Sequence, residues 1–442
     1  MAGKAPKARV ATSVLAGALL LAGCAPIDTR TPAPALTAGI HLHAHAGDDD
    51  LLTAGLGEAG LRSPVPPTFA NPEQPTAQEL RRRAIWTNWR GIADLAPGGG
   101  YGEFYGSLQP VPGREYHAFA TLPGRRQPHR LLVQVPDTFD LGKRCVIVTA
   151  SSGSRGIYGA IALAGAWGLP RGCAVAYTDK GAGTGYVDTV DGRGTGIDGL
   201  PVDAGEASEF TVVAHAGEGV APIAVKHAHS GDNPEADWGR HLKQAAEFSL
   251  QVLNEARPEA GAWTFANTRV IAVGVSNGGG AVLRAAELPG DWLGGAVAVS
   301  PNVLPGDGGR ALYDYGTQAA LWMPCALNAA AFDGVPLARP GGAKDPAGTA
   351  RCASLQAADA LAASDAQSLA EAARRRLNAQ GWTDAALAAG ALSTSFDLWR
   401  AVSITYASSY ARTGPENMPC GYRLAAVSAD GKARTPTATE RA

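Results

Sequence analysis

The stretch RVIAVGVSNGGGAVLRAAE, residues 269–287, decides the fold because it combines a strand, a sharp turn and a helix. β-branched residues fill its first half, and Ala, Leu and Arg, which favour helices, fill its second half. Between them, GVSNG at residues 274–278 matches the G-x-S-x-G pattern, in which a serine stands at a strained strand-to-helix corner. Flanking glycines relieve the close approach of strand and helix. A glycine-rich turn with an incidental serine is the alternative, but the strand and helix on either side favour Ser276 as a nucleophile.

Two further segments provide candidate donors for an oxyanion. The corner places the backbone N–H of Asn277 at the positive end of the following helix. An earlier apolar strand runs into SSGSRG, residues 151–156, and in an α/β-hydrolase the loop after the corresponding strand donates the second N–H. Ser152 and Gly153 are therefore the candidate donors. A phosphate-binding loop is the competing interpretation, but no Walker lysine follows and the dinucleotide spacing is absent.

The strand pattern indicates an α/β fold. Continuous apolar runs of strand length occur at residues 143–150, 172–178, 269–275 and 294–300. Strands that are apolar on both faces are typical of a parallel sheet covered by helices. A hairpin is expected at residues 115–122 and 129–136, and helices at 157–168, 236–256 and 278–288. We therefore predict an α/β-hydrolase-like, mostly parallel sheet with helices on both faces.

The chain changes character after this sheet. Residues 308–412 are rich in alanine, are helical in pattern and contain no convincing parallel strand. We expect them to form a helical cap inserted after the strand that ends at Ser300. The expected organisation is a signal peptide at residues 1–24, an irregular lead-in at 25–75, an α/β core at 76–305, a helical cap insertion at 306–412 and an irregular tail at 413–442.

Charge and the N-terminus limit the partners. The 442 residues include 38 basic and 40 acidic side chains, for a net charge of −2, which gives no electrostatic footprint for nucleic acid. Three positive charges precede the apolar run VATSVLAGALLLA, which is too short for a comfortable membrane span. LAGC at residues 21–24 resembles a bacterial lipobox, in which Cys24 is lipidated and anchors the protein to a membrane. Cleavage as an ordinary secretory signal is the alternative, and both predict a periplasmic or secreted protein.

Export permits disulfides. Cys325 and Cys352 lie close enough in sequence to staple a loop, whereas Cys145 and Cys173 fall on predicted strands and are expected to be small buried hydrophobic residues. With Cys420, the count is odd, so one thiol lacks a partner.

Alternating histidines, His41, His43 and His45, are followed by the carboxylates of Asp48, Asp49 and Asp50 in HLHAHAGDDD, residues 41–50. Such side chains could bind a metal. In a flexible segment they are more often solvated, so we predict no metal site.

Several long stretches are similar to one known family. WTNWRGIADL (86–95), GGGYGEFYG (98–106), VTASSGSRGIYG (148–159), AYTDKGAGTGY (176–186) and VGVSNGGGAVLRAAE (273–287) resemble the bacterial D-(-)-3-hydroxybutyrate oligomer hydrolases, and the resemblance runs from about residue 50 to about residue 425. It implies a serine esterase that cleaves short ester oligomers to 3-hydroxybutyrate monomers, downstream of polyhydroxybutyrate depolymerases. It also implies that Ser276 is the charge-relay serine and that no cofactor is needed.

The base and the acid of this charge relay present a difficulty. In α/β-hydrolases they follow the serine in sequence, yet all nine histidines here precede Ser276. We therefore expect a C-terminally truncated member of the family. The alternative to an active hydrolase is then a catalytically inactive protein that lacks the triad histidine and acid. A competing hypothesis takes an upstream base from VKHAHSGDNPEADW, residues 225–238, which offers His227 and His229 with Asp232 and Asp237. These residues read as a polar surface loop. Asp179, at the end of its strand, either lines a cleft or belongs to a turn.

Overall fold

The computed structural model describes residues 33–93, 95, 108–212, 223–304, 306–422, 426–427 and 433–434. The predicted signal peptide and Cys24 therefore lie outside the described residues, and so does the GGGYGEFYG stretch. Within the described part of the chain, no helix is long and apolar enough to cross a membrane.

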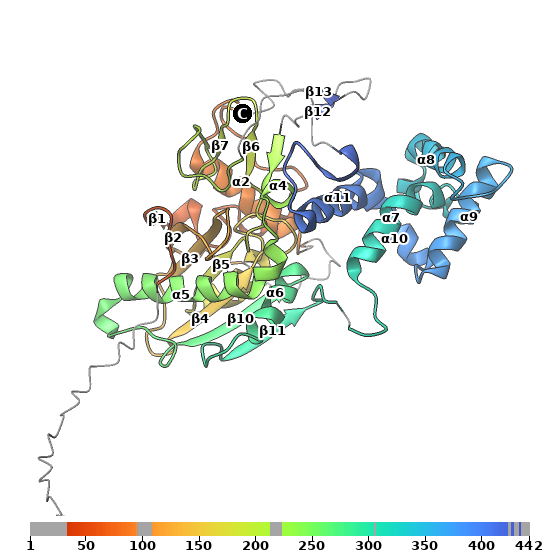
Figure 1. The fold of residues 1–442 in the computed structure, drawn as a ribbon. Coiled ribbons are helices and arrows are strands. Elements are labelled where there is room, and N and C mark those ends of the chain that lie inside the picture. Colours follow the sequence, from red (N-terminus) through yellow and green to blue (C-terminus); the bar gives the residue numbers. More distant parts are fainter. Residues whose placement is uncertain are drawn as a thin grey trace, which may run out of the picture.

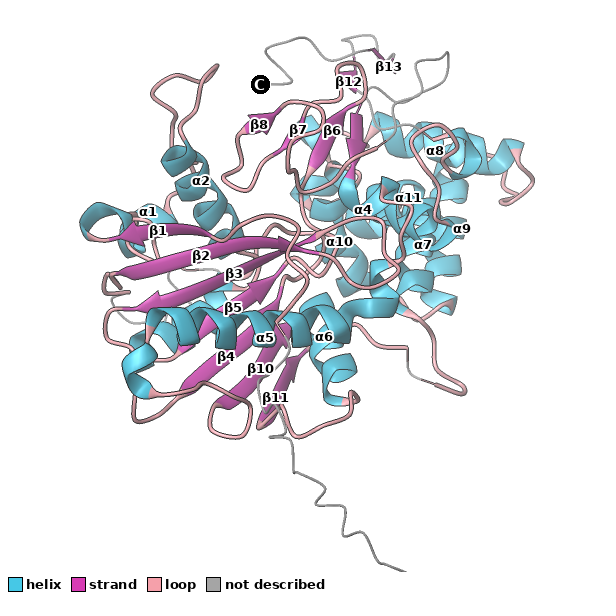
Figure 2. Ribbon diagram, turned by 60° about the vertical axis from the view of Figure 1, so that its left-hand side comes forward, coloured by secondary structure: helices cyan, strands magenta, loops and turns pink. Residues whose placement is uncertain are grey.

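A seven-stranded sheet forms the centre of the molecule, in the order β1-β2-β3-β5-β4-β10-β11 (Figure 2). The strands are β1 His41–His45, β2 Gly113–Ala120, β3 His129–Pro136, β4 Cys145–Ala150, β5 Ala174–Thr178, β10 Arg269–Val275 and β11 Gly295–Val299. β5, β4, β10 and β11 run parallel, whereas β1, β2 and β3 pair antiparallel. The predicted hairpin and the mostly parallel α/β sheet are confirmed. β1 differs from expectation, because part of the predicted irregular lead-in pairs with β2 as an edge strand.

Helices cover both faces of this sheet because the central strands are apolar on both sides. Alternate residues of β4 point to opposite faces: Val146 and Val148 pack with α5 (Trp238–Ala256) and α6 (Asn277–Ala286), whereas Ile147 packs with α2 (Ala77–Arg90). α5 and α6 lie side by side on one face (Figure 2).

The helix expected at residues 157–168 is mostly replaced by a π-helical turn at Ile161–Gly165, followed by the short α3 Ala166–Gly168. A Cβ on Gly165 would lie 2.6 Å from the hydroxyl of Tyr177, and one on Gly168 would lie 2.9 Å from Ile147 and Val175. The backbone thus approaches the sheet too closely for an ordinary side chain, and the glycines that permit this approach do not favour a regular helix.

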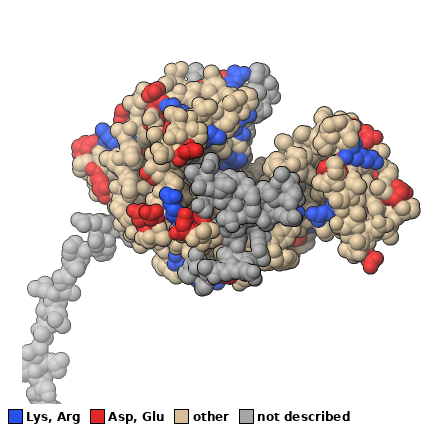
Figure 3. Space-filling model, turned by 90° about the horizontal axis from the view of Figure 1, so that it is seen from above, with Lys and Arg blue, Asp and Glu red and all other residues tan. Residues whose placement is uncertain are grey.

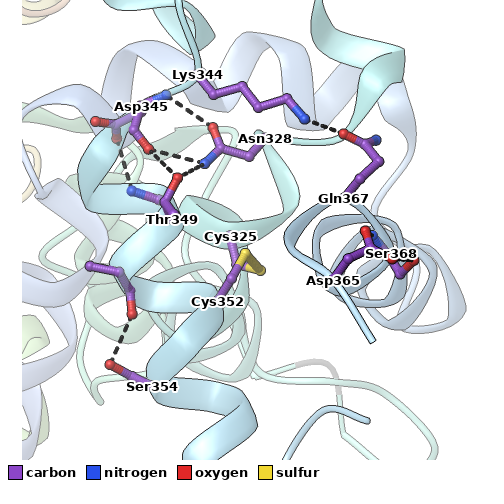
Figure 4. Close-up of a disulfide and its surroundings, with 12 residues drawn as sticks. Cys325, Asn328, Lys344, Asp345, Thr349, Cys352, Ser354, Asp365, Gln367 and Ser368 are labelled. Carbon is purple, nitrogen blue, oxygen red and sulfur yellow. Dashed lines mark hydrogen bonds between the residues drawn. A yellow bond between two sulfur atoms is a disulfide. The ribbon is translucent and has the colours of Figure 1, made fainter. Parts of the chain in front are cut away.

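Residues 306–422 form a group of helices beside the sheet (Figure 1), with no strand among them. They are α7 Leu312–Ala326, α8 Pro346–Ala357, α9 Ala366–Ala379, α10 Asp384–Ser395 and α11 Leu398–Ala411. α7 to α10 enclose a hydrophobic cluster of their own. A disulfide between Cys325 and Cys352 joins α7 to α8, and Asp345 caps α8 next to it (Figure 4). α11 turns back and packs on α4 (Lys226–His229) of the core.

The cysteines are settled by the fold. The Cys325–Cys352 pairing agrees with the sequence, and Cys420 is the exposed free thiol. The expectation for Cys145 and Cys173 is wrong, because they form a disulfide. β4 and β5 are adjacent parallel strands with Val146 opposite Ala174, so the two preceding cysteines face each other.

Small elements complete the structure. Above the sheet lie the short strand pairs β6 (Tyr186–Asp188) with β9 (Ile223–Val225) and β7 (Gly194–Thr195) with β8 (Pro201–Val202). The remaining elements are α1 Gly57–Arg62, β12 Ala426–Val427 and β13 Ala433–Arg434. On the face seen in Figure 3, basic and acidic side chains are mostly intermixed.

Candidate active site

Ser276 stands at the corner between β10 and α6, with the strained dihedral angles φ 57° and ψ −123°. Its N–H donates to the carbonyl of Val299 at 3.0 Å, and its own carbonyl accepts from the N–H groups of Gly280 and Asn302, both at 3.0 Å. These three bonds, to the neighbouring strand, the helix and the next loop, hold a conformation that a serine otherwise avoids. The side chain is partly exposed, and its hydroxyl has no hydrogen-bond partner within the described residues.

The glycines of the motif permit this corner. A Cβ on Gly274 would lie 2.3 Å from the carbonyl oxygen of Gly278, and a Cβ on Gly278 would lie 2.5 Å from that of Ala150. The first contact arises because α6 packs closely against β10, the strand that precedes it. The second places the start of α6 directly against the end of β4, and therefore next to the loop that follows β4.

That loop contains the predicted oxyanion donors. Ser152 is buried, and Gly153 has a φ of 55°. The N–H groups of Ser152, Gly153 and Asn277 have no acceptor within the described residues. N–H groups without acceptors, next to a partly exposed serine, are what stabilisation of an oxyanion requires.

Lys180 holds this loop in place through hydrogen bonds from its buried side chain. Its side chain is buried, and its Nζ donates to the Ser151 hydroxyl at 3.0 Å and to the Gly153 carbonyl. Burial lowers the pKa of Lys180 to about 8, although Asp179 and Glu235 act to raise it. The sequence contained no clear signal for this contact, because Lys180 lies 27 residues from Gly153.

The side chain of Asn277 connects the corner to the helical insertion. Its Nδ2 donates to the hydroxyl of Tyr406 on α11, and its Oδ1 accepts from Asn302 at 2.9 Å. Burial raises the pKa of Tyr406, so this hydroxyl stays protonated. The ring of Tyr406 meets the ring of His227 edge to face, with centroids 4.9 Å apart.

The sequence suggested that the histidines of residues 225–238 lie in a surface loop, but the structure buries them. His227 and His229 are both only 3% exposed, on α4. The two expected carboxylate partners contact neither: Asp232 accepts from backbone N–H groups of residues 126 and 127, and Asp237 pairs with Arg125 and Arg240.

The partner of His227 is instead Glu235, whose Oε1 lies 2.6 Å from Nε2. The other nitrogen, Nδ1, bonds to the hydroxyl of Ser154. Sequence reasoning missed Glu235, although it lies in the same stretch, because the pattern does not predict that the turn starting at Pro234 points this side chain toward His227. None of the hydrogen bonds among the described residues joins a histidine to Ser276.

Asp179 is buried and does not line a cleft. It lies 2.7 Å from Lys226 and accepts from the N–H groups of Arg130 and Gly181. Burial opposes its ionisation, but Lys226 and these bonds outweigh it and lower the pKa of Asp179. Its role is to close the turn after β5.

A cavity of about 800 Å³ opens beside the loop after β4. Ser154 and Arg155 line it, together with a buried ionic cluster from α2, β1, β2 and the turn after β1. In that cluster, Arg81 bonds to Glu115 and to Asp49, and His45 lies against the same two carboxylates. Burial lowers the pKa of His45, but the bonds to Asp49 and Glu115 raise it to about 9. The histidine tract is therefore a structured ion-pair network, and no group of metal-binding side chains is found within the described residues.

The sheet order, the strained serine corner after β10 and the adjoining loop after β4 define an α/β-hydrolase-like protein. The chain belongs to the 3HB-oligomer hydrolase family, whose model matches residues 27–442.

Individual relatives agree with this family. The D-(-)-3-hydroxybutyrate oligomer hydrolase of Burkholderia ambifaria is 39% identical over 479 residues, covering 97% of this chain and 69% of that protein. The enzyme of the same description from Paracidovorax citrulli is 41% identical over 440 residues, covering 88% and 62%. Among solved structures, a ligand-bound form of the rice cell wall degrading esterase LipA from Xanthomonas oryzae aligns at 9% identity and a TM-score of 0.28, over 69% of this chain and 75% of that one.

Proposed function

We propose that this chain hydrolyses oligomers of 3-hydroxybutyrate, with Ser276 as the nucleophile. The observation that carries the proposal is the corner itself, where a partly exposed serine precedes α6 next to the loop after β4, and the N–H groups of Asn277, Ser152 and Gly153 have no acceptor within the described residues. The names of the relatives supply the substrate class. The chain belongs to a family of hydrolases, and the corner is the site in it that best suits attack on an ester.

In the proposed reaction the Ser276 oxygen attacks the ester carbonyl and the hydroxyl proton passes to a base. The oxyanion is held by the N–H of Asn277 and by those of Ser152 and Gly153. The alcohol leaves with a proton, and water then releases the acyl group from the serine. Every step is acyl transfer, which needs no cofactor.

The second candidate is a protein that binds such esters without hydrolysing them. One observation favours it: within the described residues, no imidazole bonds to the Ser276 hydroxyl, and a neutral imidazole is what normally makes a serine nucleophilic near neutral pH. Both candidates keep the same substrate class and differ only in turnover.

Release of 3-hydroxybutyrate from the dimer and trimer distinguishes the candidates. If Ser276 is the nucleophile, Ser276→Ala lowers kcat/KM at least about a hundredfold, because the covalent intermediate can no longer form. Ser395→Ala, an exposed serine of α10, is the matched control and leaves the rate unchanged. A parent protein that binds the trimer without releasing product supports the second candidate. Equal rates for the parent and Ser276→Ala exclude Ser276.

A further inference from the structure

A second serine in the structure carries the features of an activated nucleophile. Ser154 lies in the loop after β4, is exposed and faces the cavity of about 800 Å³. Its hydroxyl bonds to Nδ1 of His227, and Nε2 of His227 lies 2.6 Å from Oε1 of Glu235. A serine bonded to a histidine that a carboxylate orients is the arrangement by which serine hydroxyls are activated.

The partners of His227 determine which nitrogen carries the proton. Burial opposes the ionisation of Glu235, but the bond to His227 outweighs it and lowers the pKa of Glu235, so this carboxylate only accepts hydrogen bonds. Nε2 must therefore be the protonated nitrogen. In the neutral ring Nδ1 then has a lone pair, which accepts the proton of the Ser154 hydroxyl.

The surroundings keep this histidine in place. The second oxygen of Glu235 accepts from the Ser409 hydroxyl on α11 at 3.1 Å, and the ring of Tyr406 packs edge to face on His227. His227 is 3% exposed, whereas Ser154 is exposed, so the base is shielded and the nucleophile is accessible. Among the other described histidines, His129 bonds to Thr178, but that hydroxyl is fully buried.

Hydrogen-bond donors that could stabilise negative charge developing on a substrate lie close to Ser154. The N–H groups of Ser154 and Gly156 have no acceptor within the described residues. The guanidinium of Arg155 lines the cavity, and its one hydrogen bond in the described part of the chain goes to the carbonyl of Gly91. Burial lowers the pKa of Arg155, with no carboxylate acting against it.

We propose that Ser154, His227 and Glu235 form a second acyl-transfer site, with Ser154 as the nucleophile. The Ser154 oxygen bonds to the acyl carbon while its proton moves to Nδ1 of His227, and Glu235 stabilises the imidazolium. The leaving group departs with that proton, and water releases the acyl group through the same histidine. Ser154 does not stand at the start of a regular helix, so less oxyanion stabilisation is present than at Ser276. The site therefore takes short acyl esters with good leaving groups, such as aryl esters, and phosphonofluoridates.

Labelling with a fluorophosphonate, followed by mass spectrometry of the peptides, tests this site independently of Ser276. In Ser276→Ala we expect the adduct on Ser154. Adding His227→Gln lowers its rate of formation at least about a hundredfold, the size of a general-base contribution. Glu235→Gln also lowers it. His229→Gln, a buried neighbour on α4 that contacts neither Ser154 nor Glu235, is the matched control and leaves the rate unchanged.

Each outcome separates the two serines. In the parent protein, an adduct on Ser276 alone supports the proposed function and overturns the second site, whereas an adduct on Ser154 alone does the reverse. If the Ser154 adduct forms equally fast with and without His227, the contact serves only to hold the loop, and the proposal is wrong. His227→Asn repeats the test if His227→Gln does not fold, and thermal unfolding of each variant monitors this.

Discussion

Two glycine-to-alanine substitutions, both in helices, are expected to change stability in opposite directions. In Gly278→Ala, at the start of α6, the new Cβ would lie 2.5 Å from the carbonyl oxygen of Ala150, about 0.9 Å inside the 3.4 Å at which ordinary contact begins. The carbonyl oxygen belongs to β4 in the centre of the sheet, so the helix must move. Overpacking of this kind costs about 1–3 kcal/mol. The gain from replacing glycine in a helix is at most about 1 kcal/mol.

Gly316→Ala, in α7, provides the comparison. Gly316 is buried, yet apart from its chain neighbours and the backbone of its own helix no atom lies within 4 Å of its new Cβ. Only the helix-propensity gain of about 1 kcal/mol remains, so this variant should be more stable than the parent. Urea unfolding of both variants should therefore give free energies of unfolding about 2 kcal/mol apart, with Gly278→Ala the lower.

Activity adds a second measurement. Displacement of α6 moves the Ser276 corner away from the loop after β4, so Gly278→Ala should also slow the labelling of Ser276, whereas Gly316→Ala should not. If Gly278→Ala is as stable as the parent, α6 does not press on β4 as described. Loss of stability in Gly316→Ala would show that the space near α7 is filled.

Two further predictions concern buried charges. Glu115→Gln should lower the free energy of unfolding by about 3–5 kcal/mol, because Arg81 loses its buried carboxylate partner; urea unfolding measures this, and a loss below about 1 kcal/mol would contradict it. In the folded protein the pKa of Lys180 is about 8, below the ordinary value of 10.5. Between these two pH values the unfolded chain therefore binds more protons than the folded protein does. The free energy of unfolding that this group contributes then rises with pH, by up to about 1.4 kcal/mol per pH unit. The difference in unfolding free energy between the parent and Lys180→Met should therefore shift in favour of the parent from pH 8 to pH 10.5, and a difference that stays constant would show that Lys180 is not desolvated.

The sheet was predictable where burial on both faces left an uninterrupted apolar run. The run at residues 269–275 is β10, and that at 143–150 contains β4, to within two residues at its start. β1 was missed because its alternation is short, with only Leu42 and Ala44 as apolar residues, and four of its five residues are exposed at the sheet edge. Its pairing with β2 depends on a partner more than 60 residues away, which no local pattern reveals.

The serine corner was predictable for a different reason: its backbone geometry requires particular residues. Only glycine fits at residues 274 and 278, where a Cβ would meet backbone atoms. The corner therefore leaves a recognisable pattern in residues that are close together in the sequence. The hydrogen bonds that hold the corner and its neighbouring loop are not local in this sense. Lys180 and Gly153, or Asn277 and Tyr406, meet only because β5 lies beside β4 and α11 returns to the core.

The return of α11 gives the helical insertion a direct physical connection to both serines. Through Tyr406 it holds the side chain of Asn277, the residue after Ser276. Through Ser409 it holds Glu235, and through Glu235 the ring that bonds to Ser154. Tyr406→Phe removes only the first connection, and Ser409→Ala only the second. If α11 positions the two sites separately, each substitution should slow the labelling of one serine and leave the other unchanged. Equal effects on both serines would mean instead that α11 acts by closing over the sheet as a whole.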